Sequence, residues 1–369
     1  MPSGLNGTTV NQLVRSLLDL GHRVTLITAG SSRRETWRAE RGRLSVVVVP
    51  YRARARARFL DQYRQERRAL AAEAARVDAD VFHVHWTYEF AAGALASKRR
   101  PLLVTAHDSP WTILRTVPDL YRLGRLVLAL RVRPRIRRLT AVSPYLAERW
   151  RSTMFYRRPI RIVPNAVPQL RIDVAARDLD GPLVLLEIAD DSKRKNIPGL
   201  LEAFSLVRQA LPDARLRLIG AGLEDGGPLA ATARANGLAE GVAFLGTMDR
   251  RDVAAELGAA TLFVHASLEE SQGLCMLEAL QAGLAVVAGA DSGGVAWTML
   301  DGEAARLVDV KDPRAFADAV LMLHADRGEQ RRLVEAGQAA LATRYAPEVV
   351  AGEYLQAYAA AIDDHAARR

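Results

Sequence analysis

Short apolar runs alternate with segments of helical periodicity along nearly the whole chain, which predicts strands and helices in turn. In the N-terminal half we expect strands over residues 23–28, 44–49, 81–85, 102–105 and 139–142. In the C-terminal half we expect them over residues 183–188, 215–219, 243–245, 261–265, 284–288 and 305–307. Strands separated by helices are the pattern of a doubly wound parallel sheet, and the pattern occurs twice.

Helices and a linker divide the chain into two parts. We expect one helix before the first strand, over residues 9–20, a long helix over 58–76 and a last helix over 347–361. A looser linker at about 168–182 precedes the second run of strands. Because 369 residues suffice for two domains of ordinary size, we expect one domain over residues 1–168 and a second over 175–346.

Two carboxylates, Glu270 and Glu278, stand eight residues apart in the segment that follows the expected strand 261–265. Glu270 lies in a polar loop, Gly273 follows it, and we expect a helix from Leu274 to about residue 282. A strand, loop and helix in this order direct unpaired backbone N–H groups at the crevice above a parallel sheet. The two carboxylates could therefore flank one phosphorylated ligand. Alternatively, Glu278 only interacts favourably with the helix dipole near the helix start, and Glu270 is solvated.

This segment resembles the E-x7-E signature of the retaining glycosyltransferases of family 4, which have the GT-B fold. The matching residues are Ser267, Glu270, Gly273, Leu274, Leu277, Glu278 and Ala279, whereas Ser271 and Gln272 replace a Gly-Phe pair. Further motifs of the family follow in its order: Thr105-Ala-His-Asp, Ala141-Val-Ser, Val163-Pro-Asn-Ala-Val, Lys195-Asn with Leu200-Leu-Glu-Ala-Phe, and Gly293-Gly. The resemblance extends over nearly the whole chain.

The resemblance implies a GT-B fold, in which two Rossmann-like, doubly wound domains face each other across a cleft. It also assigns the terminal segment 347–369 to the N-terminal domain. One feature departs from the family: Met1 directly precedes the glycine loop, so the first strand of the N-terminal domain is missing. A misassigned start, a trimmed chain or another element in the gap would each account for it. We expect a less stable first domain, because a missing central strand leaves backbone unpaired and apolar surface exposed.

Transfer of a sugar from a nucleoside diphosphate requires positive charge near the leaving diphosphate. Lys195 is the first candidate, with Arg194 and Lys193 beside it on the loop after strand 183–188. The alternative is that these three cations form a solvated patch. The family usually has an arginine directly after this strand, where this chain has Asp190 and Asp191.

The resemblance implies roles for the remaining site residues. Glu278 should bind the ribose hydroxyls, and Glu270 should hold hydroxyls of the donor sugar, since a carboxylate accepts two hydrogen bonds at once. The amides of Gly273 and Leu274 should meet donor phosphate or sugar. Gly4 and Gly7 form a second glycine loop, which lets backbone approach donor or acceptor.

In the first domain, His107 is the expected active-site histidine, which would contact the donor sugar or the acceptor. Asp108 beside it could orient His107 or receive a proton from the acceptor. The alternative for His107 is a hydrogen-bonded histidine at a strand end.

Several other motifs carry less weight. His83-Val-His85 could ligate a metal, but no Cys or carboxylate completes the set, and we expect neither metal nor cofactor. Gly220-Ala-Gly222 is read as a tight turn near the nucleotide. Trp297 stands where the family has a glutamate, and we expect it to pack rather than to react. Cys275 is read as a small apolar filler.

Charge divides unevenly along the chain. Residues 1–168 contain 31 Lys and Arg against 12 Asp and Glu, a net of +19, and the remainder has a net of −10. Arginine runs at 51–59 and 131–138 contribute most visibly. A basic half favours an anionic partner, such as a membrane leaflet or a phosphate-bearing acceptor. The alternative is compositional arginine bias on solvated helices, and no nucleic-acid module accompanies the charge.

We expect a retaining, metal-independent hexosyltransferase that uses a nucleoside-diphosphate sugar and a glycan or lipid-linked acceptor in cell-envelope or exopolysaccharide assembly. The alternatives are a GT-B sugar-nucleotide epimerase and a catalytically degenerate module that binds nucleotide-sugar or a membrane surface. Nothing at the start of the sequence resembles a signal peptide. We therefore expect a cytoplasmic location, peripheral at the inner membrane face.

Overall fold

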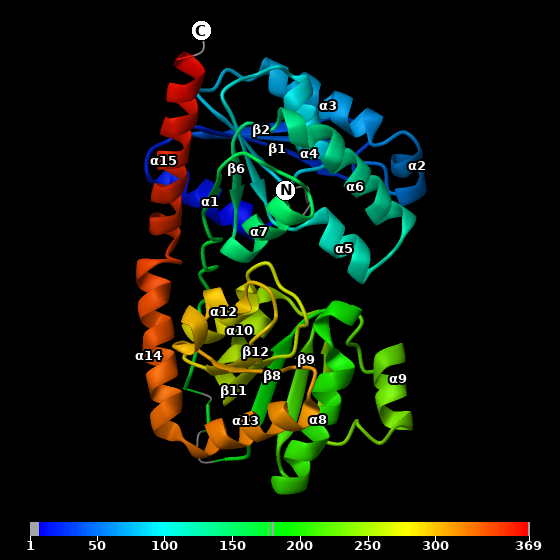
Figure 1. Ribbon diagram of the computed structural model, residues 1–369, viewed down its shortest axis with the longest axis vertical. Coiled ribbons are helices and arrows are strands. Elements are labelled where there is room, and N and C mark those ends of the chain that lie inside the picture. The colour runs from blue at the N-terminus through cyan, green and yellow to red at the C-terminus, as the bar shows by residue number, and fades with distance from the viewer. Residues whose placement is uncertain (1–6, 176, 179–180, 368–369) are drawn as a thin grey trace. The chain divides into compact units, whose positions relative to one another are not determined.

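The structure is a computed structural model and describes residues 7–175, 177–178 and 181–367. The chain forms two compact units, one of residues Met1–Ala166 with Ala346–Arg369, the other of residues Val167–Tyr345 (Figure 1). The expected boundaries at 168 and 346 lie within two residues of this division, whereas the expected start of the second domain at 175 lies inside the second unit, which begins at Val167. Gly4 lies outside the described residues.

The first unit contains two sheets. One has the order β1-β3-β2, from β1 (Val24–Gly30), β2 (Trp37–Arg41) and β3 (Leu44–Pro50). The other has the order β4-β5-β6-β7, from β4 (Phe82–His85), β5 (Leu102–Ala106), β6 (Leu139–Ala141) and β7 (Ile160–Ile162). Within the described residues, β1 and β4 are each paired on one edge only. The described strands of this unit thus form two separate sheets.

One α-helix of the first unit precedes β1, and the others follow β3. They are α1 (Thr8–Asp19), α2 (Ala55–Leu60), α3 (Arg64–Arg76), α4 (Glu89–Ala96), α5 (Pro110–Thr116), α6 (Leu120–Val132), α7 (Pro144–Ser152) and α15 (Pro347–Ala366). The single long helix expected over 58–76 is wrong. Gln62 and Tyr63 have φ of 52° and 60°, a left-handed conformation that ends α2 before α3 begins.

The terminal helix α15 belongs to the first unit because its apolar face completes a small core there. Val350, Tyr354 and Tyr358 pack with Leu13 of α1 and Leu103 of β5. The structure therefore gives a physical reason for the domain assignment of residues 347–369, since this face would otherwise be exposed.

The second unit is one six-stranded parallel sheet of order β10-β9-β8-β11-β12-β13. The strands are β8 (Val184–Ile188), β9 (Arg215–Ile219), β10 (Val242–Gly246), β11 (Leu262–His265), β12 (Ala285–Gly289) and β13 (Arg306–Val308). Its helices are α8 (Ile197–Ala210), α9 (Pro228–Ala235), α10 (Arg250–Ala259), α11 (Leu274–Gln281), α12 (Val295–Thr298), α13 (Pro313–Ala325) and α14 (Arg327–Thr343).

Alternate residues of these strands enter two different cores. Leu185 packs with Phe204 of α8 and Phe316 of α13 on one face, whereas Leu186 packs with Leu277 of α11 and Leu341 of α14 on the other. Helices thus cover both faces, as the apolar strands require. The expected α/β class with two doubly wound units is confirmed.

Two strands were not expected from the sequence. β2 reads Trp-Arg-Ala-Glu-Arg and pairs antiparallel at the edge of its sheet, where Arg38 forms a bidentate ion pair with Glu73. β7 has three residues. Among the described residues, no helix has both the length and the apolarity needed to cross a lipid bilayer.

The division of the first unit into two small sheets leads to a prediction about stability. Four of the five tryptophans, at positions 37, 86, 111 and 150, lie in the first unit. We expect urea to unfold this unit first, so that the fluorescence transition precedes the final transition in far-UV circular dichroism. Leu103→Ala in β5 should shift only the earlier transition and Leu216→Ala in β9 only the later one. Each should cost about 2–5 kcal/mol because both side chains are buried. Coincident transitions would contradict the prediction.

Candidate active site

The candidate site of the second unit lies where β8 and β11 adjoin. β8 is the first strand of this unit, and the chain runs from it to β9 on one side before returning to β11 on the other. A parallel sheet has its binding crevice at such a switch point, beyond the carboxyl ends of the strands. The loop after β8 carries Arg194 and Lys195, and the loop after β11 carries Glu270.

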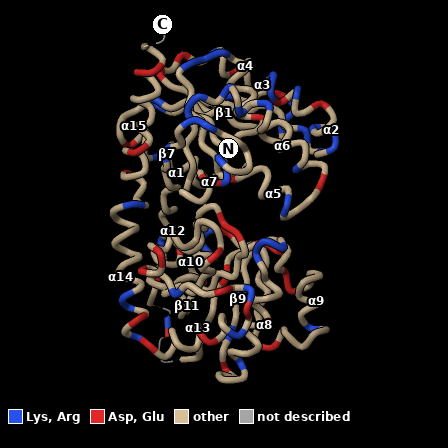
Figure 2. The backbone as a smooth tube through the Cα atoms, viewed as in Figure 1, with Lys and Arg blue, Asp and Glu red and all other residues tan. Residues whose placement is uncertain are grey.

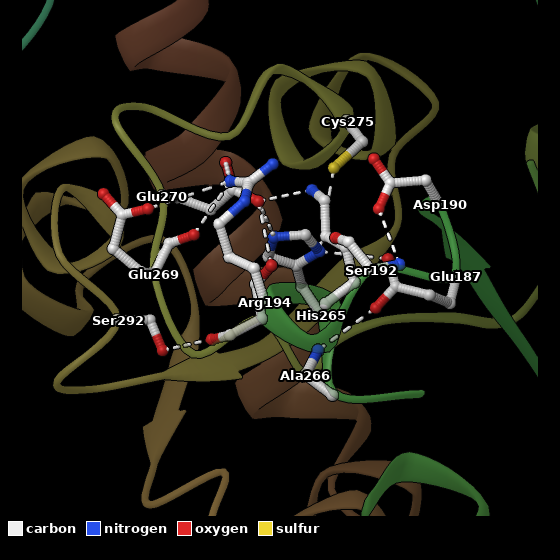
Figure 3. Close-up of polar contacts among 12 residues, drawn as sticks. Glu187, Asp190, Ser192, Arg194, His265, Ala266, Glu269, Glu270, Cys275 and Ser292 are labelled. Atoms are coloured by element: carbon white, nitrogen blue, oxygen red, sulfur yellow. Dashed lines mark hydrogen bonds and ion pairs between the residues drawn. The ribbon is translucent and has the colours of Figure 1, made fainter. Parts of the chain in front are cut away.

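Glu270 is the centre of this site, and its side chain is 9% exposed. Its Oε1 accepts hydrogen bonds from Lys195 Nζ and, at 2.9 Å, from Ser267 Oγ. Its Oε2 accepts from Arg194 Nη1 at 3.1 Å. His265, the last residue of β11, places Nε2 3.3 Å from Oε1. Figure 3 shows the side chains of Arg194 and His265 directed at Glu270.

The electrostatics of the cluster favour the charged forms. Burial raises the pKa of Glu270, but Lys195, His265 and Arg194 together lower it by more. The pKa therefore lies well below 4.5. Burial lowers the pKa of Lys195, yet Glu270 more than compensates, so the pKa of Lys195 is raised. The site therefore holds a carboxylate and two cations at neutral pH.

Backbone contacts fix the loop of Glu270 against its neighbours. Leu268 N donates to Arg194 O at 2.7 Å, which joins the loops after β8 and β11. Gly294 N donates to Glu270 O at 2.8 Å, and Glu270 N donates to Ser292 O at 3.2 Å. The loop after β12, with Gly293 at φ +69°, thus supports Glu270 from a third strand.

The helix after Glu270 carries the other expected donor residues. Gly273 is the residue before α11, with φ +81°, and Leu274 is the first residue of the helix. Glu278 lies one turn further, with Arg250 Nη2 3.7 Å from its Oε1 and a side chain that is 13% exposed. Burial raises the pKa of Glu278, and Arg250 only partly offsets this effect.

Three other expected features have a place in the second unit. Lys193 is exposed at the start of the short helix that contains Arg194 and Lys195. Asp190 accepts from Ser192 N at 3.0 Å and so shapes the loop after β8. Trp297 packs under the guanidinium of Arg344, 3.6 Å from the ring centroid.

The turn at Gly220 is tight, as expected from the sequence. Gly220 has φ +141°, and a Cβ there would lie 1.7 Å from Ala189 O. Only glycine allows this approach between the ends of β8 and β9.

The sequence reading missed two members of the site, Glu187 and His265. Both are completely buried, and His265 Nδ1 lies 3.0 Å from Glu187 Oε1. Cys275 Sγ lies 3.7 Å from the same nitrogen. Among the described residues, these three form the one group of metal-ligand type whose donor atoms lie within 4.8 Å of one another. A charged residue inside the apolar strand Val-Leu-Leu-Glu-Ile was the signal that could have revealed the pair.

The first unit has its own cluster of site residues after β4 and β5. His107 Nε2 lies 2.9 Å from His85 Nδ1, and Trp86 packs on His107 with ring centroids 4.9 Å apart. Burial lowers the pKa of His107 to about 4. Asp108 accepts a hydrogen bond from Tyr88 at 2.7 Å. Gly7, before α1, is close to Trp86, since a Cβ added at Gly7 would lie 3.5 Å from the Trp86 ring.

His83 and His85 have hydrogen-bond partners within the first unit. His83 Nδ1 contacts Tyr358 OH at 2.8 Å and its Nε2 contacts Thr105 Oγ1 at 2.7 Å. Burial lowers the pKa of His83 to about 3, so the ring is neutral at pH 7. Both ring nitrogens of His83 and Nδ1 of His85 thus contact protein groups.

Two family profiles match the chain in succession. Residues 7–169 match the family described as Glycosyltransferase Family 4, and residues 172–340 match the one described as Glycosyl transferases group 1. The first match ends and the second begins close to the start of the second unit at Val167.

Individual proteins are similar to parts or all of the chain. The lipopolysaccharide core biosynthesis glycosyltransferase LpsE of Rhizobium meliloti is 32% identical over 58% of this chain and 62% of its own length. A phosphatidyl-myo-inositol mannosyltransferase of Mycobacterium leprae is 32% identical over 58% of this chain and 56% of its own. The match thus spans about three fifths of the length of these curated relatives.

A solved structure with a similar fold is the sucrose-phosphate synthase of Thermosynechococcus elongatus. Its TM-score is 0.78 at 21% identity, over 97% of this chain and 95% of that one. At this identity, the likeness shows a similar fold.

The charge cluster around Glu270 predicts a stability effect. Glu270→Gln should lower the free energy of unfolding at pH 7 by about 3 kcal/mol, because buried cations lose their counter-charge. Since the folded-state pKa of Glu270 lies below its ordinary value of 4.5, this stabilisation is present above that pH and is lost as the pH falls through the folded pKa. Urea titrations at several pH values measure it. Glu303→Gln, at an exposed position, is the matched control. Equal losses in the two variants would contradict the prediction.

Proposed function

The chain belongs to family 4 of the glycosyltransferases, and from this premise we propose that it transfers a hexose from a nucleoside-diphosphate sugar with retention of configuration. The observation that carries the proposal is the cluster of Lys195, Arg194 and Glu270 at the switch point of the second unit. Two cations beside one carboxylate suit a ligand that joins a diphosphate to a polyhydroxylated ring.

Lys195 and Arg194 are the groups that would stabilise the leaving diphosphate. Glu270 already holds both side chains in place, so little reorganisation accompanies charge development on the phosphate. Lys193, exposed on the same short helix, adds positive charge next to these two side chains. With these cations in position we propose a metal-independent reaction without a cofactor.

The remaining donor contacts are assigned to the loop and helix after β11. Glu278 would accept hydrogen bonds from the ribose hydroxyls, and Glu270 from hydroxyls of the transferred sugar. The amides of Gly273 and Leu274, at the start of α11, would contact donor phosphate or sugar. Retention would follow from front-face transfer assisted by the leaving phosphate, without a covalent glycosyl-enzyme.

His107 is assigned to the donor sugar or the acceptor, and Asp108 to the acceptor proton or to orientation. Because the pKa of His107 is lowered to about 4, its imidazole would act as a neutral hydrogen-bonding group at pH 7. Asp108 is held by Tyr88. We assign acceptor binding to the first unit.

The acceptor class is proposed from the relatives and from charge. One relative is named for the lipopolysaccharide core and another for phosphatidyl-myo-inositol. We propose a glycan or lipid-linked acceptor in cell-envelope or exopolysaccharide assembly, with the protein in the cytoplasm at the inner membrane face.

One surface of the first unit fits contact with an anionic membrane. The side chains of Leu60, Leu120 and Leu123 are exposed on α2 and α6. Arg54 and Arg56 are exposed at the start of α2, and basic residues recur along this part of the chain (Figure 2). Exposed leucines beside arginines are typical of helices that lie in a membrane interface.

Donor binding tests the proposal. We expect UDP, GDP or ADP, or one of their sugars, to raise the melting temperature, with a stabilisation of roughly 2.7 kcal/mol at a ligand concentration of a hundred times Kd. Glu278→Ala and Lys195→Ala should abolish the shift, whereas Glu335→Ala, at an exposed position on α14, should not. Isomerisation of the sugar nucleotide without an acceptor would favour the epimerase. No shift in a folded sample would favour the degenerate binding module.

Vesicle sedimentation tests the membrane contact. We expect binding to vesicles that contain phosphatidylglycerol, weaker at high salt, and none to neutral phosphatidylcholine. Replacing Arg54, Arg56 and Arg115, the last of which is exposed on α5, with alanine should weaken it roughly 100-fold, at about 1 kcal/mol per arginine. The control replaces three exposed arginines of the second unit, Arg251, Arg314 and Arg331. An equal loss of vesicle binding in both triple variants would refute the assignment of membrane contact to this surface.

A further inference from the structure

Glu187 and His265 form a completely buried pair, and His265 lies beside Glu270. Glu187 lies inside β8 and His265 ends β11, two strands that are hydrogen-bonded neighbours. Glu187 Oε1 lies 3.0 Å from His265 Nδ1, and Glu187 Oε2 accepts from Ala266 N at 3.1 Å. Both oxygens of the buried carboxylate are thereby used within the protein (Figure 3).

The second nitrogen of His265 is directed at the site. Nε2 lies 3.3 Å from Glu270 Oε1 and has no hydrogen-bond partner within the described part of the chain. The contact is therefore one of charge rather than of an aligned hydrogen bond. Burial lowers the pKa of His265, but Cys275 and Glu187 raise it by more, and the pKa lies well above 6.5. A charged imidazolium thus stands between two carboxylates.

We propose that Glu187 and His265 form a buried charge relay that keeps Glu270 ionised and oriented, so that its Oε2 is the oxygen that meets the donor sugar. His265 is a positioning residue in this relay, and the inference rests on the proposed function of Glu270 as a donor ligand.

The distribution of partners on Glu270 indicates which oxygen is left for a ligand. Oε1 faces Lys195, Ser267 and His265, whereas Oε2 faces Arg194. A carboxylate oxygen has two lone pairs, so Oε1 is fully used and Oε2 retains capacity for a hydroxyl. Without the relay, Glu270 could turn and exchange its oxygens between these partners.

The relay can be removed without leaving a buried charge. In the double variant Glu187→Leu/His265→Leu, apolar side chains of similar size replace the pair, and such replacements of buried ion pairs are often neutral or stabilising. Single variants at either position would leave one uncompensated buried group and could fail to fold. Glu187→Gln is a milder companion, because its amide oxygen can still accept from Ala266 N while the charge is lost.

Three measurements on the full chain test the relay. Nitrogen-15 NMR of labelled histidine should show His265 as an imidazolium at pH 7.5, and as neutral in Glu187→Gln. Carbon-13 NMR of labelled glutamate should show a higher Glu270 pKa in the double variant than in the wild type. In the double variant, Kd for the donor nucleotide-sugar found by the melting screen should rise about 10–100-fold, as for other residues that orient a ligand-binding group. Its affinity should also begin to fall at a higher pH than that of the wild type.

The outcomes separate the relay from the proposed function. A neutral His265 in the wild type, or a folded double variant with unchanged Glu270 pKa, donor affinity and pH profile, would overturn the relay. If the wild type binds no nucleotide-sugar while His265 is charged and the Glu270 pKa rises in the double variant, the relay stands and the donor assignment fails.

Discussion

A carboxylate buried at the ends of two parallel strands sets the conditions for the rest of the candidate site. Glu270 is 7% exposed, and an ionised carboxylate at such a position is stable only with cationic and hydrogen-bonding partners. Those partners come from the loop after β8 and from β11 itself. The charge requirement therefore ties together segments that are about 75 residues apart in sequence.

The same requirement explains the backbone around the site. The loop of Glu270 exchanges hydrogen bonds with the loop after β12, and Leu268 binds the carbonyl of Arg194. Three loops at one end of the sheet thus hold one another, which limits the motion of the charged groups without a bound ligand. Groups that are fixed before the ligand arrives stabilise developing charge more effectively than groups that must first reorganise.

Much of this arrangement was predictable from the sequence, and the reasons for success and failure are physical. Apolar runs located eleven of the thirteen strands, because strands covered on both faces are strongly apolar. β2 was not predicted because an edge strand tolerates charged residues such as Arg38 and Glu40, so that its sequence lacks an apolar run. The helix break at Gln62 and Tyr63 was not predicted because neither residue type favours a left-handed backbone. The sequence patterns of the family singled out Glu270, Lys195 and Gly273, and both family profiles confirm that resemblance.

The pairing of Glu187 with His265 could not be predicted from the sequence for a different reason: it depends on which strands are neighbours. The two residues are 78 positions apart, and only the strand order of the sheet brings them together. Burial alone does not fix the charge of a histidine, as the two units show. His107, whose pKa is shifted by burial alone, has that pKa lowered to about 4, whereas His265, equally buried but beside Cys275 and Glu187, has its pKa raised well above 6.5. The groups beside a buried imidazole thus decide whether it serves as a neutral hydrogen-bonding group or as a fixed cation.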